Sequence, residues 1–265
     1  MKKYLLLLFC AVQLGVSAQN TYVNAFVGVS NYQGDLQSKI FVSQEAKLAI
    51  GAGMTHELSD HFAVRWQLTF ATVGGNDKYG KNVSRNLSFA SNIYEGVVAG
   101  EYYLRNLKDY SFTPYAFAGI GIFHFNPYTK DAAGRKIFLW GLNTEGQGFS
   151  NNRSPYTLIQ FSIPFGGGIK YALNENMHLG LEMGLRKLFT DYLDDLSTTY
   201  VDQNVLLTNR GAKAVELAYR GDELPNGKPY PAAGTQRASP KYKDWFYFGG
   251  ITASFKLSNN SRQRY

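Results

Sequence analysis

The chain has 265 residues and a formal net charge of +7; 45% of its residues are hydrophobic, 15% aromatic and 18% charged. So many aromatic residues argue against a disordered chain, and the scattered positive charge forms no basic cluster that would indicate nucleic-acid binding. Beyond the N-terminal leader there is no run of about 18 apolar residues, so membrane-spanning helices are excluded as well.

Residues 1–18 are predicted to be a secretory signal peptide. Met1-Lys2-Lys3 precede a short apolar run, and Val16-Ser17-Ala18 end it with small residues at the two positions that signal peptidase reads. Cleavage is expected near Gln19. Cys10, the only cysteine, lies within this leader. The mature chain is therefore expected to have neither disulfide bonds nor thiol chemistry.

Eight segments of the mature chain show the alternation of polarity that is typical of β-strands. A strand sends successive side chains to opposite faces, so this alternation predicts one apolar and one polar face. The segment 115–125 is apolar at both its odd and its even positions, so the pattern does not show which of its faces points outward. Most segments have about ten residues, the length of a tilted membrane-spanning strand. The predicted strands are residues 21–30, 46–54, 62–72, 93–104, 115–125, 158–171, 179–189 and 245–257.

The connections between these strands are alternately long and short. The long ones are residues 31–45, 74–86, 126–155 and 190–244, and the short ones are residues 57–61, 105–112 and 173–177. This is the layout of an outer-membrane barrel, and an even strand number places both termini at the short-turn, periplasmic end. We predict one barrel domain over residues 19–257 and a periplasmic tail, 258–265. The connection 190–244 is long enough to contain local structure.

Parity alone does not decide which face of the strands meets lipid. In the last but one strand, Leu181 and its apolar neighbours oppose Glu182 and Arg186. A soluble lipocalin-like barrel would bury the leucines around a ligand cavity. The charges of the polar parity balance, however, and balanced charges can pair inside a narrow lumen; we expect Glu182 to pair with Lys170 or Arg186. These lumen charges are Arg65, Glu95, Glu101, Lys170, Glu182 and Arg186.

The favoured fold is therefore all-β: an eight-stranded antiparallel transmembrane β-barrel with long extracellular loops and its apolar face toward outer-membrane lipid. Aromatic residues recur near the strand ends, where the interfacial belts of a bilayer would hold them. The interior of an eight-stranded barrel is just wide enough for its own side chains. A diffusion pore is therefore not expected, and function is expected at the rims.

The sequence gives no catalytic constellation. Of the four histidines, His178 shares a face with Glu182, but four residues along a strand separate them by about 13 Å, too far for the contacts of a hydrolase triad. The Gly166-Gly167-Gly168 run lies within a strand and is not followed by a helix, so it is no phosphate loop; it is expected to relieve crowding. We predict no enzymatic activity, cofactor or small-molecule substrate.

One loop contains clustered carboxylates, a feature that can bind calcium. These are Asp191, Asp194, Asp195 and Asp202. Their spacing does not match an EF-hand loop, and the preferred interpretation is a group of solvated surface acids. No metal ligand is assigned.

Several stretches together resemble the PorG family, small outer-membrane barrels of the type IX secretion system. They are "NYQGDL" (31–36), "NLSF" (86–89), "TPYAFAGIGIFHFNP" (113–127), "NTEGQG" (143–148), "FSIPFGGGIKY" (161–171) and "GLRKLFTDYLDD" (184–195). The resemblance runs from the first strand to about residue 202. It implies a non-catalytic role in secretion, in association with a periplasmic ring of the PorK lipoprotein and PorN, and with the secretion translocon as a further candidate partner.

Under this resemblance, the partner lies in the periplasm, where only the short turns and the tails are exposed. The turns offer mixed charges, which suit a modest polar interface. In the tail, Arg262 and Arg264 are further candidates for pairing with acids of a ring subunit. The competing interpretation is a free-standing adhesin or structural barrel that acts through its long loops. The candidate partner-binding residues are Glu57, Asp60, Arg105, Lys108, Asp109 and Glu175.

Overall fold

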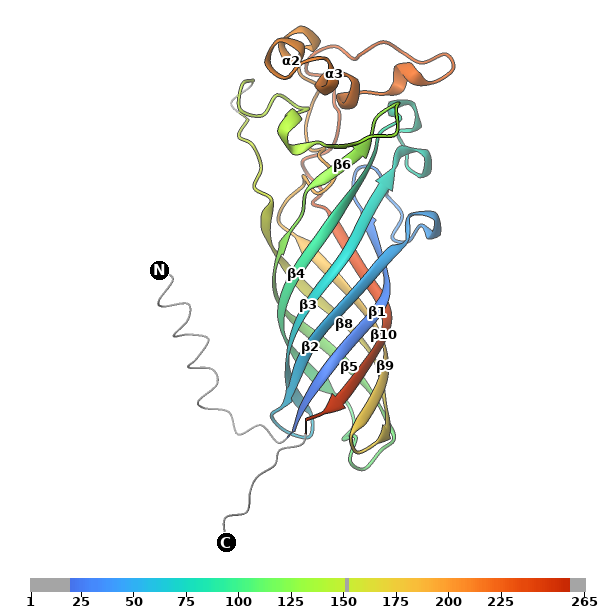
Figure 1. Cartoon of the computed structure of the whole chain (residues 1–265), viewed down its shortest axis with the longest axis vertical. Helices are drawn as coiled ribbons and strands as arrows, with labels where there is room; N and C mark the ends of the chain where they lie inside the picture. Colours follow the sequence, from blue (N-terminus) through green and yellow to red (C-terminus); the bar gives the residue numbers. More distant parts are fainter. Residues whose placement is uncertain (1–19, 151–152, 258–265) are drawn as a thin grey trace, which may run out of the picture.

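Eight strands close into an antiparallel barrel in the computed structural model of the chain, which describes residues 20–150 and 153–257 (Figure 1). The strands follow one another around the barrel in chain order, and the pairing of the first with the last closes it. The predicted fold is confirmed; the predicted leader and tail lie outside the described residues. The barrel strands are β1 (Thr21–Gln33), β2 (Lys47–Glu57), β3 (Phe62–Asn76), β4 (Ser88–Tyr103), β5 (Phe112–His124), β8 (Ile159–Asn174), β9 (Met177–Leu188) and β10 (Trp245–Lys256).

The hairpin of β3 and β4 is longer than the sequence pattern predicts. β3 continues to Asn76, which pairs with Ser88 at the start of β4, so the connection begins later than residue 74. The additional residues include Val73 and Phe89, which are buried in the same core as loop residues such as Leu139. The hairpin is therefore extended by packing against distant loops, which local alternation does not report.

The outer face of the barrel is apolar and the inner face polar. Leu68 and Leu181 are 72% and 64% exposed, whereas Arg65 and Glu182 are 5% and 6% exposed. In β5, which the sequence did not orient, Ile120 faces outward, whereas Tyr115, Phe117 and Phe123 are buried. Apolar side chains thus cover the outside of a closed strand system with charges inside, the arrangement of a transmembrane barrel.

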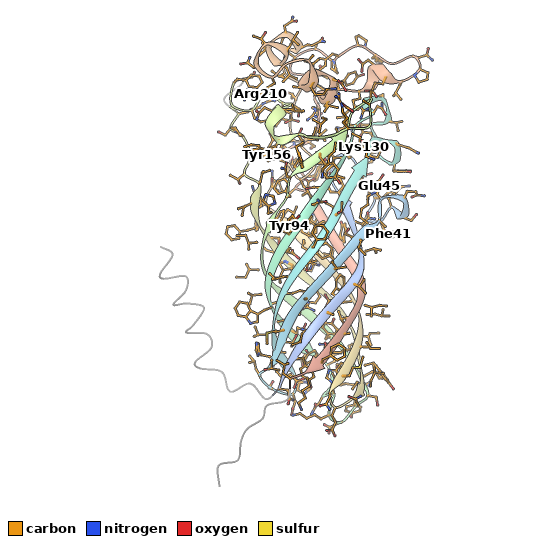
Figure 2. All side chains as sticks on the ribbon, in the orientation of Figure 1. Phe41, Glu45, Tyr94, Lys130, Tyr156 and Arg210 are labelled. Atoms are coloured by element: carbon orange, nitrogen blue, oxygen red, sulfur yellow. The ribbon has the colours of Figure 1, made fainter. Side chains whose placement is uncertain are left out.

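Aromatic side chains lie on the outer face toward both ends of the strands. The rings of Phe62 and Tyr102 are 5.0 Å apart near the short turns. Those of Phe70 and Tyr94 are 5.2 Å apart further along the same two strands. Figure 2 shows Tyr94 on the barrel wall, below Tyr156 in the loops. Such girdles are typical of the two bilayer interfaces.

Two glycines of the Gly166-Gly167-Gly168 run permit close packing of the barrel wall. A Cβ on Gly166 would lie 2.1 Å from the carbonyl oxygen of Met183, and one on Gly168 would lie 2.2 Å from that of Leu181. Both contacts are with the backbone of β9, which cannot move away without breaking its pairing with β8. A side chain is therefore excluded at both positions.

The long loops fold into a structured cap, here residues 127–150, 153–157 and 190–244. It lies at the end of the barrel opposite the short turns, with both helices at its top (Figure 1). No helix in the described part of the chain is long and apolar enough to span a bilayer. The regular elements of the cap are the hairpin β6 (Pro127–Lys130) and β7 (Lys136–Phe138), α2 (Gln203–Arg210), α3 (Ala212–Ala218) and the 3-10 turns η4 (Trp140–Leu142) and η5 (Gly221–Glu223). The other loops contribute the 3-10 turns η1 (Ser43–Glu45), η2 (Asp77–Tyr79) and η3 (Val83–Arg85).

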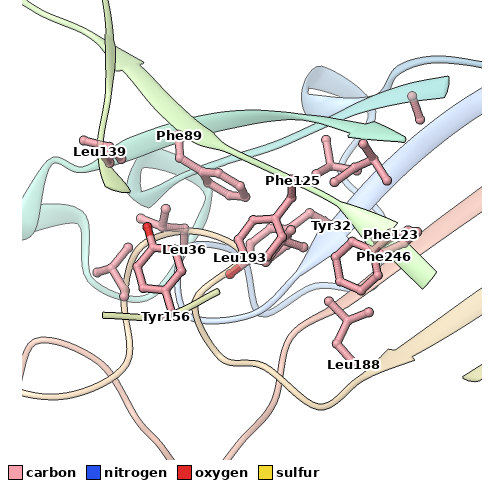
Figure 3. Packing of buried hydrophobic residues seen from close by; sticks show 14 of the residues in the cluster. Tyr32, Leu36, Phe89, Phe123, Phe125, Leu139, Tyr156, Leu188, Leu193 and Phe246 are labelled. Atoms are coloured by element: carbon pink, nitrogen blue, oxygen red, sulfur yellow. The ribbon is translucent and has the colours of Figure 1, made fainter. Parts of the chain in front are cut away.

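A hydrophobic core joins the cap to the upper barrel (Figure 3). Tyr32 and Phe125, from the barrel side, meet Tyr156 and Leu193 from the cap. All four are buried. The loops at this rim are therefore packed together as one unit with the barrel.

Candidate functional site

Six charged side chains from four strands meet in the lumen, and they are the six predicted lumen charges. Arg65 occupies the centre: its Nη1 lies 3.1 Å from Oε1 of Glu101, and its guanidinium also donates to Glu182. The hydroxyl of Tyr115 donates to Glu182 over 2.6 Å. Glu182 is thus paired with Arg65 from across the lumen, and the expected pairing with Lys170 or Arg186 is wrong.

Further ion pairs flank those of Arg65, and the whole set is here called the lumen ladder. It consists of Arg65, Glu95, Glu101, Lys170, Glu182 and Arg186. Lys170 Nζ lies 3.2 Å from Oε2 of Glu101 and donates to the hydroxyl of Tyr103 over 2.9 Å. Arg186 Nη2 lies 3.2 Å from Oε2 of Glu95. Each buried charge has a partner, which offsets the cost of removing it from water.

This ladder fills the lumen. The cavity beside Arg65, between Asn24 and Thr252, holds only about 10 Å³. The guanidinium of Arg65 also lies 4.6 Å from the ring centre of Phe117. A space of this size takes about one water molecule.

At the short-turn rim the chain forms a concave vestibule of about 800 Å³. All three short turns and the ends of β1 and β10 contribute to it. Five of the six candidate partner-binding residues line it; the exception is Arg105, whose guanidinium lies over the rings of Tyr110 and Phe112. The lining residues with charged side chains are Glu57, Asp60, Lys108, Asp109, Glu175 and Lys256, with His178 beside them.

Polar contacts between the turns fix the shape of this vestibule. Lys108 Nζ lies 2.8 Å from Oδ1 of Asp60, joining the β4–β5 turn to the β2–β3 turn. Asn20 donates to Glu57 over 2.7 Å, which ties the start of β1 to the end of β2. The Lys108–Asp60 pair is about half exposed and contributes little to stability. Asn20 and Lys256 were not among the predicted partner-binding residues, because those were taken from the short turns, whereas Asn20 precedes β1 and Lys256 ends β10.

The cap contains a second buried charge centre, around Glu145. Its carboxylate accepts hydrogen bonds from the backbone N–H groups of Ser197 and Thr198 and from Arg237, whose Nη1 lies 3.1 Å from Oε1. Both charged side chains are almost completely buried. A similar pair joins Arg85 and Asp77, with Arg85 Nη2 2.6 Å from Oδ1. Sequence reasoning missed these residues because loops offer no periodic pattern.

The loop carboxylates are not solvated surface acids, and the preferred interpretation of them is wrong for three of the four. Asp194 and Asp195 are fully buried and accept hydrogen bonds from the hydroxyls of Tyr32 (2.5 Å) and Tyr156 (2.7 Å). Asp191 is also buried and accepts one from Ser197. Only Asp202 is exposed, and there it caps the N-terminus of α2.

Burial raises the pKa of these carboxyls. The pKa of Asp191 rises to about 7 and that of Asp195 to about 6, in each case chiefly through desolvation. Desolvation also raises the pKa of Asp194 and Asp244. Among the described residues no group of three or more His, Cys, Asp or Glu side chains is arranged to hold a metal ion. The cluster has the contacts of a structural centre of the cap.

The described histidines make contacts at the barrel ends and form no triad with a hydroxyl and an acid: Nδ1 of His56 lies 3.1 Å from the hydroxyl of Thr21. The ring of His178 lies 4.8 Å from that of Tyr22, while Glu182 is bound to Arg65. His61 contacts the carbonyl oxygen of Tyr103 through Nδ1. These contacts are those of side chains that support the barrel ends.

Comparison with protein families identifies the chain by sequence. The profile of a family described as a domain of unknown function, DUF6089, matches residues 2–209. The chain belongs to the DUF6089 family. Membership of DUF6089 does not by itself assign an activity, and the narrower resemblance to PorG remains a prediction. Curated protein sequences gave no significant match.

The solved structures similar to this DUF6089 protein include several outer-membrane proteins, all at low sequence identity. Neisserial surface protein A is 9% identical with a TM-score of 0.45, over 91% of this chain and 99% of that one. Ail of Yersinia pestis, an attachment invasion locus protein, is 8% identical with a TM-score of 0.43, over 90% and 98%. PagL, described as an outer-membrane enzyme, is 11% identical with a TM-score of 0.32, over 89% and 99%. At these values no function is transferred.

Proposed function

We propose that this protein is a non-catalytic outer-membrane component of a type IX secretion machinery, which holds the periplasmic ring at the outer membrane. The observation that carries the proposal is the blocked barrel with a concave polar rim. The Arg65–Glu182 ladder fills the lumen, so transport through it is disfavoured, and the vestibule gathers Glu57, Asp60 and Lys108 at one end. The choice of the type IX machinery, and of ring proteins similar to PorK and PorN as partners, rests on the resemblance to PorG.

The proposal includes the orientation of the barrel. The short turns and both termini face the periplasm, and the cap faces the outside of the cell. Outer-membrane barrels commonly have short periplasmic turns and long outer loops. The described strands have this asymmetry, since the β8–β9 turn is two residues long and the β9–β10 connection contains two helices.

Deletion of the gene is the primary test of the proposal. If the protein belongs to the secretion machinery, substrates of the system accumulate in the periplasm and complementation restores their export. Normal export in the deletion strain would overturn the proposal. A sharper test replaces residues 105–109 by a minimal hairpin turn and measures co-purification with the ring proteins; loss of the ring from a normally inserted barrel is the expected result.

A second candidate is a free-standing surface barrel that acts through its cap. The observation that favours it is a cavity of about 540 Å³ in the loops, lined by Tyr200, Tyr219 and Lys228 among others. Pockets of this size accommodate small ligands. The deletion distinguishes the two: a surface adhesin affects attachment and leaves export unchanged. Neighbouring genes for ring and translocon proteins favour the secretion role.

A further inference from the structure

The vestibule at the short-turn rim is a blind depression. Its inner wall includes Tyr22, Tyr103 and His178, which are buried at the ends of β1, β4 and β9. Behind this wall, Tyr103 binds Glu101 and Lys170 of the lumen ladder, and the cavity lined by Arg65, Glu101 and Lys170 holds only about 10 Å³. A peptide segment that enters the vestibule from the short-turn side therefore stops at the rim and does not pass into the lumen.

The vestibule is acidic, although the whole chain is basic. Its lining has four carboxylates and two ammonium groups, those of Glu57, Asp60, Asp109, Glu175, Lys108 and Lys256. With His178 neutral, the lining has a net charge of −2, whereas the chain has +7. Lys108 is already bound to Asp60. Concave surfaces with one sign of charge concentrate the field and attract ligands of the opposite sign.

The neutral lining suits the same kind of ligand. Tyr22 and Tyr110 contribute aromatic rings and hydroxyls, and Asn106 and Asn174 contribute amide oxygens. Carboxylates and aromatic faces together bind ammonium and guanidinium groups. Arg105 makes such a contact within the chain, with its guanidinium 5.4 Å from the ring centre of Tyr110.

We propose that the vestibule is the receptor for a cationic segment of a periplasmic partner, whose lysine or arginine side chains enter it. The inference rests on the proposed function for the side of the membrane and for the existence of a partner. It adds the place of contact and the charge of the segment. Glu57, Asp109 and Glu175 supply the attraction, since Asp60 is shared with Lys108.

The test uses the full-length mature barrel in lipid nanodiscs and a fluorescent hexa-arginine peptide as probe, with hexa-glutamate as the matched anionic peptide. Hexa-arginine is expected to bind, and hexa-glutamate is not. The triple variant Glu57→Gln, Asp109→Asn, Glu175→Gln is expected to weaken binding about tenfold and to reduce its salt dependence. Folding of each variant is checked by its heat-modifiable migration on gels.

The matched control removes three acids at the opposite rim: Glu216→Gln, Asp222→Asn and Glu223→Gln. This variant is expected to bind hexa-arginine as the unchanged protein does. The proposal would be overturned if both triple variants lost hexa-arginine binding equally, or if the vestibule variant lost none. Truncation after Leu257 removes Arg262 and Arg264; if truncation alone raises hexa-arginine affinity about tenfold, the tail of the chain is the occupant and the partner proposal is wrong.

A cellular measurement separates this inference from the proposed function. The ring proteins are expected to co-purify with the unchanged barrel and to be reduced about tenfold with the vestibule triple variant. If they co-purify equally with both, the barrel still docks the ring but through another surface, and only the inference fails. If they co-purify with neither and export is normal, the proposed function fails.

Discussion

Arg65 and Glu182 form an ion pair across the lumen although 117 positions separate them in the chain. Arg65 is on β3 and Glu182 on β9, and Glu101 on β4 is the second carboxylate bound to the same guanidinium. Three strands are thus joined through one buried cation. The pairing requires the barrel to be closed, because these strands do not neighbour one another in the sheet except for β3 and β4.

The first prediction tests the two faces of β9 with neighbouring substitutions. Leu181→Arg is expected to place a charge in the apolar surface at a cost of about 2–4 kcal/mol and to impair barrel assembly. Glu182→Gln leaves Arg65 paired with Glu101 and is expected to leave assembly largely intact. The measurement is the folded fraction of each variant in outer-membrane preparations. Tolerance of Leu181→Arg together with loss of assembly in Glu182→Leu would mean that the faces are inverted.

The second prediction concerns the buried pair in the cap. Arg237→Ala leaves Glu145 fully buried without its counter-charge, and breaking such a pair costs about 3–5 kcal/mol. The cap is expected to become sensitive to limited proteolysis while the barrel stays intact. Lys213→Ala serves as the control, because Lys213 is partly exposed on the cap surface and its pairs contribute little. Equal protease resistance of the two variants would contradict the structural role of Arg237.

The third prediction is a pH dependence of the cap. Burial raises the pKa of Asp191 to about 7 and of Asp195 to about 6, so the folded cap binds protons more tightly than the unfolded chain does. The contribution of these carboxyls to stability is therefore greatest below their unfolded pKa near 3.8 and declines as the pH rises to about 7. Unfolding of the cap, followed by tyrosine circular dichroism in the near ultraviolet, is expected at lower temperature at pH 8 than at pH 5.

A matched pair of variants assigns this pH dependence. Asp191→Asn removes the titrating carboxyl from its buried position. It is expected to reduce the difference between the unfolding temperatures of the cap at pH 5 and pH 8. Asp222→Asn changes an exposed acid of the same cap and is expected to leave the difference unchanged. A cap that becomes more stable toward pH 8 would contradict the raised pKa values.

The barrel was predictable from sequence because its signal is local. Alternation along 179–189 separates Leu181 from Glu182, and the structure keeps that separation. The cap was not predictable in the same way. Asp194 looked solvated because its burial depends on Tyr32, 162 positions away. No periodic pattern links such residues, so the sequence indicated which side chains face the lumen but not which of them pair.

The last prediction tests the orientation of the barrel in the outer membrane. Cys10 lies in the predicted leader, so the mature chain offers no competing thiol to single-cysteine labelling. Ala233→Cys lies in an exposed part of the cap and is expected to react with a membrane-impermeant maleimide on intact cells. Asn176→Cys lies in the exposed β8–β9 turn and is expected to react only after the outer membrane is permeabilised. Labelling of both after permeabilisation controls for accessibility. The reverse pattern would place the vestibule on the cell surface and remove the basis for a periplasmic partner.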